Sequence, residues 1–260
     1  MITDERRSKI LQIAEESGFV SLQQLVAEVG ASESTIRRDL EYLDTQGHLH
    51  RTRGGAAYAG ESLMDFDVRQ NQASREKQLI AQRTAERIPA GETVLLDGGT
   101  TTLEVARFLN GKPLQVVTNS LPIASLLMNQ PEIELIFVGG YVYPKTGVAL
   151  GDQAIEALKK INVSRLVMST GGVTSEGLFN SNALLVETER QMIASAERVT
   201  LVADSTKFGQ RALSHLCPLS AVHEIVTDDG MSDEWRQTLL AGGIELEVVE
   251  VQDRSMAGST

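Results

Sequence analysis

The fold is first indicated by residues 32–43, which read SESTIRRDLEYL. Ser32 is a typical N-cap, and the residues after it favour a helix. A projection at about 100° per residue gathers the apolar side chains on one side, which we expect to be buried. These inner residues are Ile36, Leu40 and Leu43. The opposite side carries two adjacent arginines, so the pattern predicts a helix with an apolar inner face and a cationic outer face.

Two further helical segments come before this one. Residues 4–17 carry an apolar stripe at helical spacing. The next segment begins at a capping-box pair, Ser21 and Gln24, and ends at Gly30. Short helices joined by a turn that contains glycine are typical of a helix-turn-helix, in which the 32–43 helix takes the second position.

The outer face of the 32–43 helix has the groups that recognise the major groove of DNA. A guanidinium can pair with O6 and N7 of guanine or hold a phosphate, and hydroxyl groups can also contact base edges. The predicted DNA-binding residues of this helix are Ser34, Thr35, Arg37 and Arg38. On an isolated helix these arginines would more often pair with Glu33 and Glu41 on a solvated surface, but the helix-turn-helix setting favours DNA.

A candidate wing follows the helix. Residues 48–56 alternate in character and turn at Gly54 and Gly55, which predicts a two-stranded ribbon. Arg51 and Arg53 are two residues apart, so they share one face of the ribbon and can reach phosphate or the minor groove. The alternative is an ordinary hairpin with exposed arginines. Its place directly after the candidate reading helix favours a wing that binds DNA.

Composition limits the class of protein. The 260 residues are 42% hydrophobic and 23% charged, as in an ordinary globular protein, and the net charge is −11. The single cysteine, Cys217, excludes an internal disulfide and a zinc site with several cysteines, and the four histidines lack metal-ligand spacing. The first residues, 1–6, have no apolar signal core, and no apolar run is long enough for a membrane span. We therefore expect a cytoplasmic protein without a metal, a cofactor or a membrane partner.

The predicted regions are a winged helix-turn-helix domain (1–57), a linker (58–75), an α/β domain (76–251) and a flexible tail (252–260). From residue 93 onward, short apolar strands alternate with helical segments. This alternation predicts a mostly parallel sheet with helices on both faces. The seven predicted strands are 93–96, 115–117, 134–138, 165–168, 199–203, 224–226 and 245–249.

Small, hydroxyl-bearing or charged residues follow the predicted strands, where an open α/β sheet binds its ligands. Residues 97–102 read DGGTTT and precede a helix, so backbone amides, hydroxyl groups and the helix N-terminus can hold a phosphate, whose charge Lys207 would balance. The loop has neither the Gly-Lys-Ser/Thr of a nucleotide triphosphate site nor the GxGxxG of a dinucleotide site. The predicted ligand-binding residues are Asp97, Gly98, Gly99, Thr100, Thr101, Thr102, Thr118, Asn119, Gly139, Gly140, Gly171, Gly172, Glu187 and Lys207.

Taken together, these motifs resemble the DeoR family of bacterial repressors. The motifs that carry the resemblance are SESTIRRDL at 32–40, Gly47, RTRGGA at 51–56, DGGTT at 97–101, TNS at 118–120, GG at 139–140 and DSTKFG at 204–209. The resemblance covers residues 3–251 and implies a winged helix joined to a sensor domain that is folded like ribose-5-phosphate isomerase. The family often has a basic residue two positions after the glutamate that Glu187 matches, whereas this chain has Glu189.

The resemblance implies that the chain is a transcriptional regulator and that it is not an enzyme. Family members commonly repress carbohydrate-catabolic operons and release DNA when a phosphorylated sugar binds. We expect a homodimer or homotetramer on double-stranded operator DNA, because operator palindromes mirror the two-fold symmetry of the protein. Activation in place of repression stays open. Two alternatives remain, a sugar-phosphate isomerase with Asp97 or Glu187 as the base and Lys207 nearby, and a winged helix that binds protein.

Overall fold

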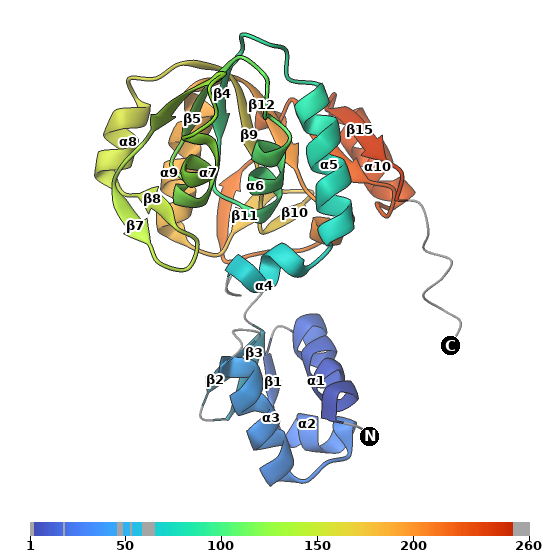
Figure 1. The fold of residues 1–260 in the computed structure, drawn as a ribbon. Helices are drawn as coiled ribbons and strands as arrows, with labels where there is room; N and C mark the ends of the chain where they lie inside the picture. The colour runs from blue at the N-terminus through green and yellow to red at the C-terminus, as the bar shows by residue number, and fades with distance from the viewer. Residues whose placement is uncertain (1–2, 18, 46–48, 53, 59–65, 252–260) are drawn as a thin grey trace. The chain divides into compact units, whose positions relative to one another are not determined.

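The structure is a computed structural model that describes residues 3–17, 19–45, 49–52, 54–58 and 66–251. The chain divides into two compact units, Met1–Arg69 and Gln70–Thr260 (Figure 1). The first contains the helix-turn-helix and the second the α/β sheet, so the predicted fold class is confirmed. The predicted tail, 252–260, lies outside the described residues.

In the first unit, helices pack against a small antiparallel sheet. The helices are α1 (Thr3–Ser17), α2 (Leu22–Val29) and α3 (Glu33–Thr45), and the strands β1 (Phe19–Ser21), β2 (Leu49–Thr52) and β3 (Gly55–Tyr58) pair in the order β1-β3-β2. As predicted, α2 begins at the Ser21–Gln24 capping box and ends at Gly30, whose φ is 71°. The inner residues predicted for α3 are buried in a core with residues of the other elements, among them Ile10, Leu25 and Leu49.

The strand β1 was not predicted, and it changes the role of one glycine. The sequence assigned Gly55 to the turn of a two-stranded ribbon. In the structure Gly55 is also paired with Ser21 of β1, and a Cβ at this position would overlap the carbonyl oxygen of Val20. Glycine is therefore required by the close approach of β1 to β3.

The second unit is built on a parallel sheet that contains all seven predicted strands. Its order is β15-β14-β12-β9-β4-β5-β6, with every neighbouring pair parallel. The strands are β4 (Thr93–Leu96), β5 (Leu114–Thr118), β6 (Ile133–Phe137), β9 (Val163–Met168), β12 (Ala196–Val202), β14 (Glu224–Asp228) and β15 (Glu245–Val249). Apolar residues on both faces of the central strands explain why the sequence shows continuous apolar runs there.

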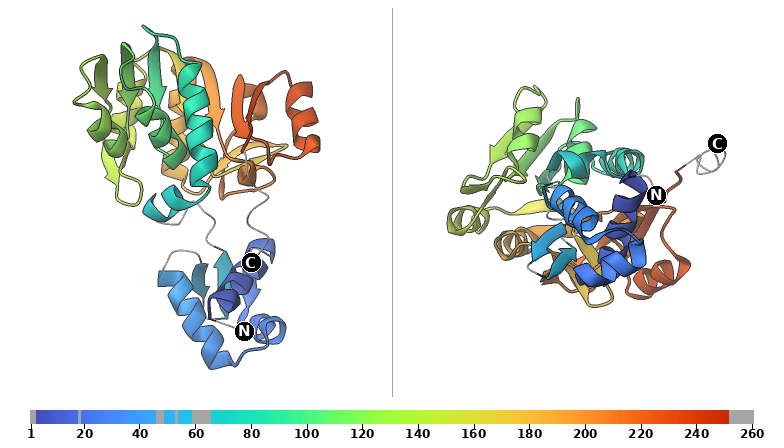
Figure 2. Two further views of the ribbon diagram at one scale, coloured as in Figure 1. Left: turned by 45° about the vertical axis from the view of Figure 1, so that its right-hand side comes forward. Right: turned by 90° about the horizontal axis from the view of Figure 1, so that it is seen from below.

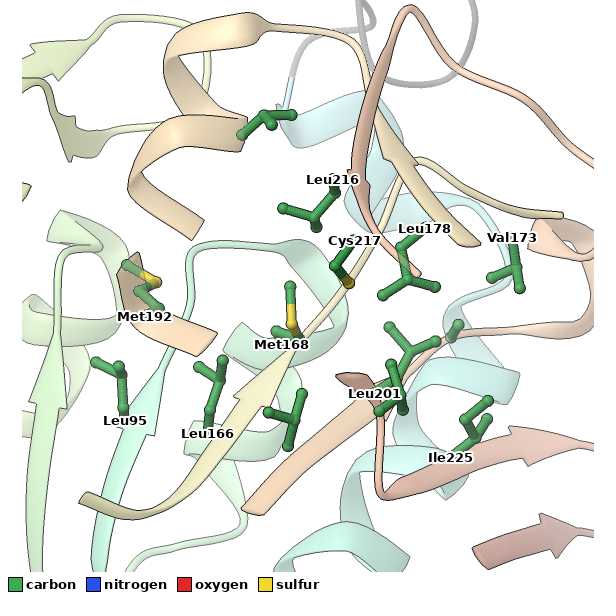
Figure 3. Packing of buried hydrophobic residues seen from close by; sticks show 14 of the residues in the cluster. Leu95, Leu166, Met168, Val173, Leu178, Met192, Leu201, Leu216, Cys217 and Ile225 are labelled. Atoms are coloured by element: carbon green, nitrogen blue, oxygen red, sulfur yellow. The ribbon is translucent and has the colours of Figure 1, made fainter. Parts of the chain in front are cut away.

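Helices cover both faces of this sheet. On one face lie α5 (Ser74–Glu86), α6 (Thr100–Arg107) and α7 (Leu121–Leu127), and α5 and α6 run side by side in Figures 1 and 2. On the other face lie α8 (Asp152–Leu158), α9 (Ala183–Ala194) and α10 (Asp233–Ala241). Figure 3 shows the apolar core of this second face, where strand residues such as Leu95, Leu166 and Leu201 pack with Met192 of α9.

Several short elements were not predicted. They are α4 (Phe66–Asn71), a hairpin of β7 (Tyr141–Tyr143) and β8 (Val148–Leu150), and a small antiparallel sheet of β10 (Gly172–Thr174), β11 (Gly177–Asn180) and β13 (Ser214–Cys217). Because α4 and the start of α5 fall within 58–75, the predicted linker contains helical structure. The domain limits themselves stay predictions. Among the described residues, no helix has the length and apolar character needed to cross a membrane.

Candidate DNA-binding surface and sensor site

The N-terminus of α3 presents a group of hydroxyls at the surface. Ser32 Oγ accepts a hydrogen bond from the Thr35 backbone N–H at 3.3 Å, which confirms the predicted N-cap. The same oxygen lies 3.0 Å from Ser34 Oγ and 2.8 Å from Thr35 Oγ1. In a helix-turn-helix, the N-terminal residues of the second helix are those that contact base edges, so these hydroxyls are in the right place for that contact.

Arg37 and Arg38 are exposed on the outer face of α3, as the projection predicted. Arg37 also makes the ion pair of the alternative interpretation, with Nη2 2.7 Å from Glu33 Oε1. Such an exposed pair contributes only about 0.3–0.5 kcal/mol, so a DNA phosphate or guanine can replace it at little cost. Glu41 pairs with Arg51 of β2 instead, at 3.8 Å. Arg53 lies outside the described residues.

A buried acid that sequence reasoning missed fixes α3 against α1. Asp39 is only 2% exposed, and its two carboxylate oxygens accept hydrogen bonds from Arg6 Nε at 2.5 Å and Arg7 Nε at 3.0 Å. The Arg7 guanidinium also lies 3.6 Å from the centre of the Tyr42 ring. Asp39 is three residues after Ile36, so its place on the inner face was visible in the spacing. A charged residue is seldom buried unless it is paired, as Asp39 is here.

In the second unit, the predicted ligand residues other than Glu187 lie at or just after the carboxyl ends of the parallel strands. The connections from β4 and β9 leave toward opposite sides of the sheet, because β4 continues to β5 and β9 to β12. This is a topological switch point, where open α/β sheets bind ligands. A Cβ at Gly99 would overlap Ser169 Oγ, so the loops after these two strands meet closely. A Cβ at Gly98 would overlap the Val148 side chain.

Helix α6 starts at this point with a run of buried threonines, Thr100 to Thr102. Thr102 Oγ1 accepts a hydrogen bond from the Gly99 N–H at 2.7 Å and lies 2.9 Å from the Gly99 carbonyl, which fixes the first turn. The first amides of a helix lack intrahelical acceptors and form its positive end. The structure therefore places the 97–102 loop and a helix N-terminus together, as the sequence predicted.

The end of β5 brings polar groups beside Asp97, which is itself buried. Thr118 Oγ1 donates to the carbonyl of Leu96 at 2.8 Å and so ties β5 to β4. Asn119 is 1% exposed, and its Nδ2 donates to Ala149 O at 2.9 Å. Its Oδ1 has no hydrogen-bond partner among the described residues, which leaves a buried acceptor at the strand end.

Three of the four remaining predicted glycines lie where a Cβ would contact neighbouring atoms closely. A Cβ at Gly140 would lie 2.7 Å from Leu150 O, and one at Gly171 would lie 3.0 Å from Asn180 Oδ1. A Cβ at Gly172 would overlap the backbone of Gln210. Gly139 is exposed. Contact of these four residues with a ligand stays a prediction.

Lys207 ends the turn that follows β12, Ser205–Lys207. Burial lowers the pKa of the Lys207 ammonium to about 8, so most of its charge remains at neutral pH. Asp204 begins the turn and accepts a hydrogen bond from the Thr206 N–H at 3.2 Å. Burial raises the pKa of Asp204, while the nearby Lys77 acts in the opposite direction. Lys77, 4% exposed and on α5, is a charged residue of this region that the sequence did not reveal.

Glu187 and Glu189 have opposite environments on α9. Glu187 is exposed, and its ligand-binding role stays a prediction. Glu189 is buried, and both of its oxygens lie 2.7 Å from Asn180 Nδ2. Burial raises the pKa of Glu189 well above its usual range, and the charge of Asp97 adds to this shift. Glu189 is three residues from both Val186 and Met192, which are buried, and this spacing was the signal for its inward position.

Comparison with known proteins assigns both units. Residues 6–61 match the model of the DeoR-like helix-turn-helix domain, and residues 72–229 match that of the DeoR C terminal sensor domain. The chain belongs to the DeoR family. It is therefore a helix-turn-helix transcriptional regulator with a sensor domain, and the family resemblance noted in the sequence is confirmed.

DeoR-family relatives align over almost the whole chain. The glycerol-3-phosphate regulon repressor of Escherichia coli (strain K12) is 32% identical over 247 residues, which cover 94% of this chain and 98% of that protein. The HTH-type transcriptional regulator UlaR of Escherichia coli (strain SMS-3-5 / SECEC) is 28% identical and covers 95% and 99%. Among solved structures, ribose 5-phosphate isomerase A of Methanocaldococcus jannaschii aligns with a TM-score of 0.38 and 16% identity over 51% of this chain and 53% of that chain.

Among the described residues, no group of three or more His, Cys, Asp or Glu side chains could hold a metal ion. The polar groups described for the second unit are of the kinds that can bind anions and hydroxyl groups. They are the α6 N-terminus, the Lys207 ammonium and the buried oxygens of Asp97 and Asn119.

Proposed function

We propose that this DeoR-family chain is a repressor that leaves its operator when a phosphorylated sugar binds to the second unit. The observation that carries the proposal is the meeting of the 97–102 loop, the α6 N-terminus and further polar strand ends at the switch point of the sheet. A relative named for the glycerol-3-phosphate regulon, aligned over 94% of this chain, supports an effector of this kind.

In this proposal α3 reads the operator. Ser34 and Thr35 at its N-terminus and Arg37 and Arg38 on its outer face contact base edges or phosphates in the major groove. Arg51 of the wing, with Arg53, holds the DNA backbone. Two copies on a palindromic operator place two such helices one helical turn apart, which is about 34–36 Å.

The effector binds by its phosphate and by its hydroxyl groups. The α6 N-terminus and Lys207 bind the phosphate, because both supply positive charge at a partly dry site. The buried oxygens of Asp97 and Asn119 accept hydrogen bonds from sugar hydroxyls. Release of DNA then requires only that the effector binds the DNA-free conformation about 5–150-fold more tightly, a coupling of about 1–3 kcal/mol.

The test is a titration of the full chain on labelled duplexes from the region upstream of its own gene, at fixed salt. We expect saturable binding, and a panel of phosphorylated sugars should contain at least one that raises the Kd for DNA at least fivefold. The unphosphorylated sugar is the control and should have no effect. The proposal is wrong if no duplex is preferred over a scrambled one, or if no phosphosugar changes the affinity.

We also propose that the second unit binds its ligand without converting it. Its homology to transcriptional regulators supports this, although its buried carboxyl groups are of the type that isomerases use. Incubation with ribose 5-phosphate and with each phosphosugar that binds, followed by NMR, should show no new signals. Any product formed in proportion to the protein concentration would favour the isomerase alternative.

A further inference from the structure

We propose that the outer margin of the second unit beside β6 is an interface with a second copy of this chain. The sheet ends at β6, so one side of this strand has no neighbouring strand within the sheet. The hairpin extends the same margin, because β8 bridges to Ser120 just beyond β5 and β7 pairs with the far side of β8. In Figure 1, β7 lies at the left-hand margin of this unit.

Large apolar side chains are exposed along this margin, and we call them the edge patch. The edge patch consists of Leu121, Met128, Ile136, Phe137, Tyr141 and Val142. Neighbouring strand residues point to opposite faces, so Ile136 and Phe137 expose apolar surface on both sides of the edge strand. Natural proteins usually protect such an edge with charges, bulges or a covering element. An uncovered apolar edge strand therefore indicates a partner.

The size of the edge patch fits a dimer interface. Large side chains present ~150–250 Å² when fully exposed, so the exposed fractions of these six residues, from 37% to 66%, leave about 500 Å² of apolar surface. A standard interface buries about 800 Å² on each partner, of which about 60% is apolar. The edge patch thus supplies about as much apolar surface area as one partner of a standard interface buries.

The charges along the margin favour a second copy in a two-fold arrangement. Exposed Glu132 and Glu134 lie at the start of β6, while exposed Lys145 lies in the β7–β8 turn near the other end. In a two-fold dimer the two β6 strands lie antiparallel, so the start of one β6 lies beside the end of the other. Glu132 and Glu134 of each copy then face Lys145 of the other copy. The net charge of −11 makes whole copies repel each other, so a charge-poor patch is where they can meet.

The test is the mass of the full chain in solution by sedimentation equilibrium. We expect the parent to be an even multiple of one 28.2 kDa chain. Tyr141→Glu and Met128→Glu, tested as separate variants on two elements, should each raise the Kd of association at least tenfold and halve the mass. Both side chains are more than half exposed, so the fold should tolerate the change. Circular dichroism verifies that it does.

Two variants at exposed leucines elsewhere in the unit are the matched controls. Leu213→Glu and Leu240→Glu change residues that are 83% and 55% exposed, and both should keep the parent mass. A single-chain mass for the parent overturns the proposal. So does an unchanged mass for both patch variants, or dissociation of the controls to the same extent. The inference rests on the proposed function because a palindromic operator requires two-fold symmetry of the protein. The mass measurement uses neither DNA nor sugar. The proposed interface and the proposed function can therefore fail independently.

Discussion

At the scale of single residues, Lys207 makes effector binding depend on pH. Burial lowers the pKa of its ammonium to about 8, whereas a bound phosphate dianion favours the charged form and raises that pKa. At a pH between the pKa of Lys207 in the free protein and its higher pKa in the complex, the free ammonium has lost its proton. Lys207 must then take up a proton when the phosphate binds. Affinity for the phosphate therefore falls as the pH rises through 8.

We predict that the Kd for the phosphosugar rises by up to tenfold for each pH unit between pH 8 and about 9.5. The phosphate itself stays a dianion in this range. Isothermal titration at half-unit steps measures this. Lys207→Arg is the control, because a guanidinium keeps its charge and should give an almost constant Kd over the same range. A constant Kd for the parent would contradict the role of Lys207.

Glu189 gives a second prediction of pH dependence, this time of stability. Its pKa is raised in the folded state, so the carboxylic acid is the form that the fold prefers. The stability that this group contributes is present below its unfolded pKa, near 4, and is lost as the pH rises through the folded value. Glu189→Gln keeps the shape and cannot ionise. We expect it to melt a few degrees above the parent at pH 8, because about 1 kcal/mol shifts Tm by about 2–4 °C in a unit of this size.

Thermal unfolding of both proteins from pH 4 to pH 8.5 is the measurement. The difference in Tm should shrink as the pH falls and disappear near pH 4, where both side chains are neutral. A difference that does not change with pH would mean that Glu189 is not held in its protonated form by the fold.

At the scale of elements, the approach of β1 to β3 depends on Gly55. A Cβ at this position overlaps the carbonyl oxygen of Val20, so Gly55→Ala must push the two strands apart. We predict a loss of about 1–3 kcal/mol in the free energy of unfolding of the first unit and a weaker grip on DNA, because the wing shifts. Gly54→Ala is the matched control, since a Cβ there has open space.

Urea unfolding and operator titration of the two alanine variants give the comparison. Equal behaviour of Gly54→Ala and Gly55→Ala would show that the glycine pair serves only as a turn, as the sequence alone suggested.

At the scale of the whole molecule, the salt dependence of DNA binding separates phosphate contacts from structural charges. Each phosphate contact adds about 0.9 to the slope of log Kobs against log salt concentration. Arg51→Ala should lower the slope by about 2 on a palindromic operator, since each of two copies loses one contact. Arg107→Ala, an exposed arginine of α6 in the second unit, should leave the slope unchanged. An unaltered slope for Arg51→Ala would remove the wing from the DNA contacts.

Much of this architecture was predictable because it is local. Most strands of the parallel sheet contain a short apolar run that small or polar residues follow, and the α3 face repeats at helical spacing. The small sheet was not predictable, because its strands have three or four residues and Leu178 pairs with Cys217, 39 positions away. Buried charges were missed for another reason. Asp39, Lys77 and Glu189 are of residue types that are mostly exposed, and for Asp39 and Glu189 the helical spacing was the only sign of burial.

The link between α1 and α3 also limits how this protein can change over generations. One carboxylate, Asp39, satisfies two guanidiniums that lie 32 and 33 positions earlier in the chain. Loss of Asp39 alone would leave the half-buried guanidiniums of Arg6 and Arg7 without their carboxylate. Loss of both arginines would leave the buried carboxylate of Asp39 without a cation. We therefore expect Arg6, Arg7 and Asp39 to be retained together or replaced together as the sequence evolves.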